Sequence, residues 1–284
     1  MSANEVILRE RGEPGTPERL AAALDTMRSA APLVHNITNY VAMNLQANVL
    51  LAAGASPAMI HAREEAAEFA AIASALTINI GTLEPAWLDA MLWSAEAARD
   101  AGRPWVLDPV AVGATTYRRQ AGGVLLARRP RAIRANASEV IALAGIGQPS
   151  ADGGGRGVDA TDGVAAAEEA ARDLARRSGA VVAVTGAEDY VTDGTRAVLV
   201  HGGDPMMPRV TAMGCSLSGL CGAFLAAVDD PFDAVTAACA LFAVAGARAG
   251  CAAAGPGSFQ MAFLDQLHMI APEDLADEAR VMPA

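Results

Sequence analysis

The chain has 284 residues, a hydrophobic fraction of 52% and a net charge of −11. The length suits one large α/β domain or two small ones, and the hydrophobic content excludes an intrinsically disordered protein. The negative charge argues against nucleic acid as a partner, because binding a phosphate backbone requires a concentrated basic surface.

The first 17 residues are predicted to form a poorly ordered tail, and residues 1–284 are interpreted as a single domain because no domain boundary is evident. Residues 1–15 are polar and charged and lack the apolar core of a signal peptide. We identify no apolar run of the roughly 20 residues that span a bilayer. The sequence therefore predicts a cytoplasmic protein without a membrane partner.

Short apolar runs alternate with Ala-, Glu- and Arg-rich stretches of helical period up to residue 185. The runs typical of buried strands are Pro57–His61, Leu76–Gly81, Trp105–Pro109, Ala132–Asn136 and Ala180–Thr185. The stretches typical of helices are Arg63–Ser74, Ala86–Ala101 and Gly163–Ser178. Such alternation predicts an α/β fold with a mostly parallel sheet and helices on both faces.

Two segments interrupt this rhythm. Gly147–Gly157 contains five glycines and is predicted to be a mobile surface loop, because no strand leads directly into it as a dinucleotide-binding loop would require. Asp193-Gly194 separates two β-rich runs, Tyr190–Thr192 and Ala197–His201, which favours a hairpin of antiparallel edge strands.

After Thr211 the chain is predicted to be almost wholly helical. The expected helices are Gly214–Val228, Phe232–Ala253 and Ser258–Ile270. Cys221, Cys239 and Cys251 lie in these Ala-rich segments and are interpreted as small buried hydrophobic residues. The four cysteines form no CxxC pair, so neither a zinc site nor a disulfide framework is indicated.

Polar residues follow several of the predicted strands. They are Asn36–Asn39, Gly81 and Thr82, Asp108, Asn136–Glu139, and Thr185 with Gly186. Each of them alone is more often a helix cap or a turn residue. Ligands of open α/β sheets bind beyond the carboxyl ends of the strands, however, and five polar strand ends in one parallel sheet describe the rim of one cleft.

The strongest local signal is the segment Ala212-Met213-Gly214-Cys215, a turn that enters a helix of small residues. A helix N-terminus offers unpaired N–H groups and partial positive charge, so it binds phosphate and tends to lower the pKa of a thiol in its first turn. The sequence contains no lysine, which excludes Schiff-base chemistry and a Walker A loop. Any phosphate site must therefore use backbone N–H groups, arginine and a metal ion.

Ordered motifs extend along most of the chain. They are Val34–Val41, Met43-Asn44 with Ala47-Asn48, Gly54–Pro57, Asn79–Leu83, Leu107–Val110 with Val112–Thr115, Ile133-Arg134 with Asn136–Glu139, Gly157–Asp159, Val184–Gly186 and Gly255–Phe259. In these motifs the chain resembles the hydroxyethylthiazole kinase family of the ribokinase-like superfamily, over about Pro32–Ile270. The resemblance implies a ribokinase-like three-layer sandwich. It also implies transfer of phosphate from ATP, with Mg2+, to 5-(2-hydroxyethyl)-4-methylthiazole in thiamin salvage, by a homotrimer with sites between subunits.

The resemblance also implies roles for single residues. Met43, Asn36, Asn39 and Ala212 would bind the thiazole; Arg134, Thr185 and Asn136 would bind ATP; Asp108 and Glu139 would hold Mg2+ partly through water; Gly214 and Cys215 would lie at the transfer site. Phosphoryl transfer needs positioning and charge neutralisation more than strong base catalysis, so Cys215 could orient the alcohol or, as a thiolate, accept its proton. The family pattern Thr-Gly-Thr/Ala-Gly-Cys reads Thr211-Ala212-Met213-Gly214-Cys215 here, and Met213 is expected to crowd a substrate.

Two alternatives follow from these residues. A related kinase could act on another small alcohol, such as a pyrimidine or pyridoxal-like alcohol, although Met43 and the segment 36–39 argue against it. A non-catalytic nucleotide- or thiazole-binding relative is suggested by Ala212 and Met213.

Overall fold

The alternating apolar runs pair into one nine-stranded sheet, and the computed structural model describes residues 15–147 and 160–284 of the chain. In spatial order the strands are β2 (Ser56–Ala58), β1 (Leu33–Ile37), β3 (Ala75–Asn79), β4 (Trp105–Asp108), β5 (Ala132–Asn136), β6 (Val181–Thr185), β7 (Asp189–Thr192), β8 (Ala197–His201) and β9 (Arg280–Pro283). The first six are parallel, and β7, β8 and β9 are antiparallel to their neighbours. The predicted mostly parallel sheet is confirmed.

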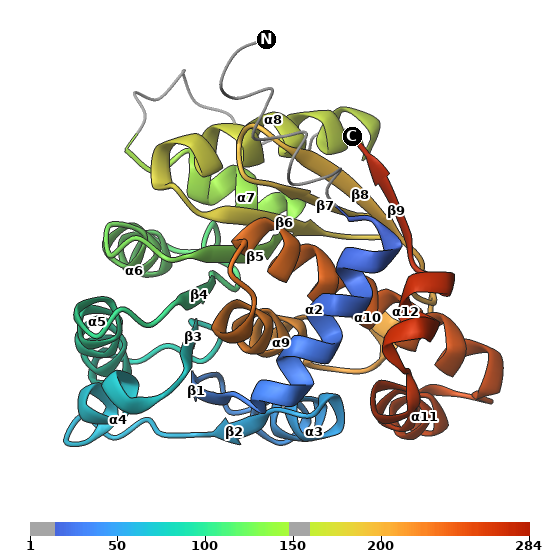
Figure 1. Cartoon of the computed structure of the whole chain (residues 1–284). Helices are drawn as coiled ribbons and strands as arrows, with labels where there is room; N and C mark the ends of the chain where they lie inside the picture. The colour runs from blue at the N-terminus through green and yellow to red at the C-terminus, as the bar shows by residue number, and fades with distance from the viewer. Residues whose placement is uncertain (1–14, 148–159) are drawn as a thin grey trace, which may run out of the picture.

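Helices cover both faces of the sheet, which gives three layers (Figure 1). One face packs against α4 (Ala66–Ile72), α5 (Pro85–Asp100), α6 (Thr116–Leu126), α7 (Ala137–Ala144) and α8 (Ala160–Ser178). The other packs against α2 (Pro17–Ala30), α3 (Met43–Ala53), α9 (Met213–Ala227), α10 (Pro231–Ala252), α11 (Pro256–Met269) and α12 (Pro272–Glu278). A short 3-10 turn, η1 (Met207–Arg209), precedes α9.

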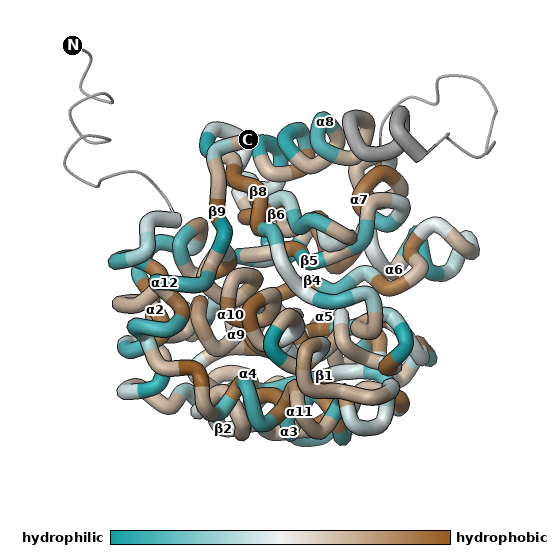
Figure 2. Tube along the Cα trace, turned by 90° about the vertical axis from the view of Figure 1, so that its right-hand side faces the viewer, coloured by the Kyte–Doolittle hydropathy of each residue, from teal (hydrophilic) through white to brown (hydrophobic). Residues whose placement is uncertain are grey.

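Strands β1, β4, β5 and β6 feed both hydrophobic layers because successive side chains point to opposite faces. In β4, Val106 joins the core beside α9 and α10, whereas Leu107 joins the core beside α5 and α6. Figure 2 shows hydrophobic residues along β8 and hydrophilic residues on the outer helix α8. The central parallel strands are therefore buried on both faces, as near-continuous apolar runs predict.

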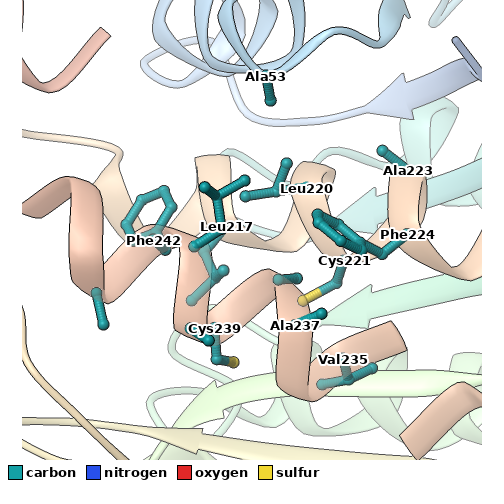
Figure 3. Packing of buried hydrophobic residues seen from close by; sticks show 14 of the residues in the cluster. Ala53, Leu217, Leu220, Cys221, Ala223, Phe224, Val235, Ala237, Cys239 and Phe242 are labelled. Atoms are coloured by element: carbon teal, nitrogen blue, oxygen red, sulfur yellow. The ribbon is translucent and has the colours of Figure 1, made fainter. Parts of the chain in front are cut away.

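The densest part of the core lies where α9 packs against α10. Figure 3 shows Leu217, Leu220 and Phe224 of α9 close to Phe242 and Cys239 of α10, with Ala53 of α3 above them. Cys221 and Cys239 are fully buried, as predicted. Cys251 is exposed at the end of α10, so its predicted burial is wrong: α10 has left the core by its last turn.

Among the described residues, α10 is also the one helix long and apolar enough to cross a membrane by length and composition alone. The expectation that no such run exists is therefore wrong. Its most apolar window is 78% buried inside the protein, so the composition of α10 reflects its place at the centre of a core layer.

The sequence-based expectations missed the C-terminal strand. The hairpin of β7 and β8 is antiparallel as predicted, but β8 is not the edge, because β9 pairs with it along 198–201. The four-residue β9 contains Pro283 and is mostly exposed, so it carries little apolar signal. Residues 1–14 of the predicted tail and 148–157 of the predicted loop lie outside the described residues, and Pro17 already begins α2.

Candidate functional site

The strand order creates a topological switch point between β1 and β3. The chain passes from β1 outward to β2 and then returns across β1 to β3, from which the sheet continues in the other direction. Connecting loops diverge at such a point and leave a crevice at the carboxyl ends of the strands. Here Asn39, just after β1, donates through Nδ2 to Oδ1 of Asn79 at the end of β3, at 2.9 Å.

Polar side chains at four neighbouring strand ends share one face of the sheet. Residues two positions earlier on β4, β5 and β6 belong to the core beside α9, so Asp108, Arg134 and Thr185 point toward that helix. Asn79 lies opposite Asp108 in the register of β3 and β4. Of the predicted cleft rim, Asp108 and Thr185 thus lie on the α9 face, where the period-two alternation of the strands places Asn79 and Arg134 beside them.

Asp108 is the central carboxylate of this group and is 1% exposed. Its Oδ2 accepts hydrogen bonds from Nδ2 of Asn79 at 2.7 Å and from Oγ of Ser218 at 2.8 Å. Its Oδ1 has no hydrogen-bond partner among the described residues and lies 3.9 Å from an Arg134 nitrogen. Burial raises the pKa of the Asp108 carboxyl above its ordinary value, against the opposing charge of Arg134.

Arg134 places a guanidinium beside the start of α9. It donates to Oγ1 of Thr185, while its Nε is buried without a partner among the described residues. A Cβ on Gly214 would come within 2.5 Å of the guanidinium nitrogens, so only glycine permits this approach. Ala212 is the N-cap of α9 and makes no side-chain cap bond. A helix start and an arginine thus converge, and together they suit an anion.

Cys215, in the first turn of α9, faces the switch point. Nδ2 of Asn39 lies within hydrogen-bond distance of its Sγ, at 3.4 Å. Burial, together with the charge of Asp108, raises the pKa of the thiol to about 11. The predicted lowering by the helix N-terminus is therefore wrong here: desolvation of a thiolate outweighs the favourable helix dipole, so the group is a thiol at neutral pH.

The comparisons with known proteins agree with this geometry. The sequence profile of the hydroxyethylthiazole kinase family matches residues 24–273. The chain belongs to the hydroxyethylthiazole kinase family. A hydroxyethylthiazole kinase of Rhizobium etli is 61% identical over 259 residues, covering 91% of this chain and 98% of that protein. One of Cereibacter sphaeroides is 60% identical over 261 residues, covering 92% and 97%.

Solved structures support the same assignment. The hydroxyethylthiazole kinase protein from Pyrococcus horikoshii OT3 superposes with a TM-score of 0.85 at 40% identity, over 93% of this chain and 98% of that one. A Bacillus subtilis pyridoxal kinase in complex with ADP has a TM-score of 0.57 at 17% identity, over 76% and 91%, and shows the common ribokinase-like fold.

Among the residues predicted for metal and nucleotide, Glu139 and Asn136 form a capping box at the start of α7. Oε2 of Glu139 accepts from the Asn136 N–H and Oε1 from the Ala111 N–H, while Oδ1 of Asn136 accepts from the Glu139 N–H. Glu139 therefore ties the turn after β4 to α7, with one lone pair left on each oxygen for water or metal. Asn136 is exposed and its amide nitrogen stays available.

The residues predicted to bind the thiazole divide into two groups. Asn39 and Ala212 lie at the switch point and the start of α9, and Met43 is the half-buried first residue of α3. Asn36 lies deeper, fully buried, where its Oδ1 accepts from Thr77 at 2.6 Å and from Gln46 at 2.8 Å. Its side-chain amide is thus already hydrogen-bonded within the protein.

Contrary to expectation, Met213 does not crowd the site. Its side chain is 6% exposed and belongs to the hydrophobic core that α9 shares with α10. Ala212, by contrast, has φ 65° and ψ 9°, so the residue at this position does adopt the left-handed conformation that glycine favours.

Sequence reasoning missed three residues of this region. Asn79 stands inside a quoted motif, and its place at a strand end was the available signal. Ser218 is only one of several small residues in the sequence of the predicted helix, although it lies one helical turn after Gly214. Arg118 gave no signal: it donates to the carbonyl oxygens of Ile80 and Val110 at 2.5 and 2.9 Å and to that of Gly81 at 2.6 Å, clamping the turns after β3 and β4 together.

Surface hollows lie elsewhere. Two of them, of about 450 and 520 Å3, are at the amino edge of the sheet. The first is lined by Trp105 at the start of β4 and by the last residues of α9, and neither contains a predicted site residue. The convergence of polar groups, rather than the size of a hollow, therefore locates the candidate site at the carboxyl edge.

Proposed function

We propose that this protein transfers the terminal phosphate of ATP to the hydroxyethyl group of 5-(2-hydroxyethyl)-4-methylthiazole, in thiamin salvage in the cytoplasm. The observation that carries the proposal is the juxtaposition, beside the switch point of the sheet, of an uncapped helix start, the Arg134 guanidinium and a buried oxygen of Asp108 that accepts no hydrogen bond from the described residues. Family membership supplies the substrate class.

The nucleotide would be held without lysine. The N–H groups at the start of α9, Arg134 and Thr185 suit the phosphates, and the exposed amide of Asn136 suits the nucleotide. The Arg134 guanidinium lies against Gly214, in the space that a side chain at this position would occupy. The terminal phosphate therefore reaches the acceptor alcohol over the first turn of α9.

The site also fits Mg2+. Among residues 15–147 and 160–284, no three His, Cys, Asp or Glu side chains are grouped as a metal site made by protein alone. Nucleotide-bound Mg2+ needs only one or two carboxylates besides phosphate and water, and the free oxygen of Asp108 meets that need, with Glu139 acting through water. When bound, the ion would neutralise charge on the transferring phosphate.

In this reaction Cys215 positions the alcohol as a neutral thiol, because its pKa of about 11 leaves almost no thiolate near pH 7. Met43, Asn39 and Ala212 contact the thiazole. Asn36 is buried behind them, where its side chain accepts a hydrogen bond from Gln46. Accordingly, Cys215→Ser should keep most of the turnover. A fall in kcat/KM beyond about 100-fold, or about 3 kcal/mol, would reject the positioning role.

We also propose a homotrimer with sites between subunits. Tyr40 and Val41, directly after the site residue Asn39, are 61% and 59% exposed, an unusual position for large apolar side chains beside a binding site. Light scattering coupled to gel filtration should give three times the 29.0 kDa chain mass. A monomer at micromolar concentration would contradict the assembly but not the chemistry.

The activity is tested by ADP release from Mg-ATP with the thiazole alcohol. Activity that requires the thiazole and Mg2+ is expected. A preference for pyridoxal or a pyrimidine alcohol would indicate a kinase of another small alcohol. Thiazole binding by calorimetry without ADP release would indicate a non-catalytic relative, the alternative suggested by the residue types of Ala212 and Met213.

A further inference from the structure

The two oxygens of Asp108 are treated unequally by the protein around them. Nδ2 of Asn79 and Oγ of Ser218 both donate to Oδ2, at 2.7 and 2.8 Å. Oδ1 receives no hydrogen bond from the described residues. A buried carboxylate held only for stability would have both oxygens paired, since an unpaired buried acceptor costs free energy.

The orientation of Asn79 is itself determined by its neighbours. Its Oδ1 accepts from Nδ2 of Asn39 at 2.9 Å and from the Gly81 N–H at 2.9 Å. With the amide oxygen so occupied, the amide nitrogen must point at Asp108. Asn79 thus cannot rotate to pair Oδ1 of the carboxylate without losing two hydrogen bonds.

These contacts close a ring that begins and ends on α9. It runs from Cys215 to Asn39, on to Asn79, to Asp108 and back to Ser218, which lies three residues after Cys215 on the same helix. Residues three apart share a helix face. The ring therefore fixes the carboxylate relative to the helix start that faces the phosphates.

We infer that Asn79 and Ser218 are positioning residues that bind one oxygen of Asp108 and so direct its other oxygen, Oδ1, to the Mg2+ of the nucleotide complex. The inference rests on the proposed function, in which Asp108 is a metal ligand. Outer partners that orient a metal-binding carboxylate contribute to metal affinity, so their loss should weaken the metal before it weakens the alcohol.

The test measures Mn2+ affinity by electron paramagnetic resonance, with a non-hydrolysable ATP analogue bound. Asn79→Ala and Ser218→Ala should each weaken Mn2+ about 10–100-fold and raise the Mg2+ concentration needed for half-maximal turnover in parallel. The KM for the thiazole alcohol should change by less than about 3-fold.

Ser216→Ala is the matched control. Ser216 lies two residues from Ser218 on α9 and is equally buried, but its hydroxyl donates to the Ala212 carbonyl instead of to Asp108. Its Mn2+ affinity should equal that of the wild type. Ser218→Ala removes a single oxygen, so it still tests the inference if Asn79→Ala fails to fold. Thermal unfolding checks that each variant is folded.

Asp108→Asn separates the positioning role of Asn79 and Ser218 from the metal-binding role of Asp108. Strongly weakened Mn2+ binding in Asp108→Asn, with wild-type affinity in Asn79→Ala and Ser218→Ala, would overturn the positioning role and leave the proposed function intact. Unchanged Mn2+ binding in Asp108→Asn would overturn the metal assignment itself and the inference with it.

Discussion

Ala212 adopts a backbone conformation that costs an L-residue free energy, at φ 65° immediately before α9. The left-handed region costs such a residue about 1–2 kcal/mol, whereas glycine enters it freely but loses more entropy on folding. Ala212→Gly should therefore leave the unfolding free energy unchanged or raise it by up to about 1 kcal/mol, measured by urea denaturation. The control Ala22→Gly, on the exposed face of α2, should lower it by about 1 kcal/mol. An equal loss in both variants would show that the turn is not strained.

His35 makes stability depend on pH. It is fully buried, its Nε2 lies 2.8 Å from the Ile60 carbonyl, and burial lowers its pKa to about 4. The folded state thus favours the neutral ring, so its contribution is complete above pH 6.5 and is lost as the pH falls toward 4. The loss should be on the order of 3 kcal/mol. His35→Gln should flatten the urea-measured pH profile between 6.5 and 4, whereas His268→Gln, at an exposed position, should leave it unchanged.

At the scale of elements, the site depends on keeping the turns after β3 and β4 together. The Arg118 side chain, from α6, spans both turns by donating to three carbonyl oxygens. Asn79 and Asp108 end these two strands and are hydrogen-bonded to each other. Arg118 therefore adds a second link between the same two strand ends, through the turns that follow them.

Arg118→Met keeps the aliphatic stem and removes the donors. It should lower kcat/KM by about 10-fold or more through displacement of Asp108, and lower the unfolding free energy by about 1–3 kcal/mol. Arg119→Met, at the next position, removes two exposed bonds, to the Gly113 carbonyl and the Thr116 hydroxyl, and should change neither quantity by more than about a factor of two or 0.5 kcal/mol. Wild-type kinetics in Arg118→Met would show that the two turns hold their positions unaided.

At the scale of the whole molecule, the two described ends of the chain meet. The strand β9 extends the sheet beside β8, and α12 packs against α2 (Figure 1). Val281 of β9 contacts the main core, and a Cβ on Gly15 would come within 2.5 Å of its side chain.

Val281→Asp should therefore lower the unfolding free energy by about 1–3 kcal/mol, because it places a charge against an apolar layer. Met282→Asp is the control, since Met282 is 51% exposed on the opposite face of the same strand. Equal urea midpoints for the two variants would mean that β9 adds nothing to the core.

Local pattern was sufficient for most of the architecture. The predicted strand Ala132–Asn136 coincides with β5, and the helices ending at Ser178 and beginning near Met213 lie within a few residues of prediction. Such elements are buried along much of their length, so their apolar period is strong. The strand β9 was missed because its pairing with β8 joins residues about 80 positions apart and leaves little trace in its own composition.

Residue types at strand ends and at the start of α9 were enough to nominate Asp108, Thr185, Gly214 and Cys215, and the family resemblance added Arg134. Their mutual orientation was decided by the tertiary structure. The helix start by itself predicted an acidic thiol, yet burial raises the pKa of Cys215 to about 11. The importance of Asn79, Ser218 and Arg118 comes from the residues that they contact. These contacts depend on strand register and helix packing. Sequence by itself thus determined which chemical groups are available at this edge of the sheet. Folding decided their protonation and the single free oxygen of Asp108, because desolvation and pairing depend on neighbours that are distant along the chain.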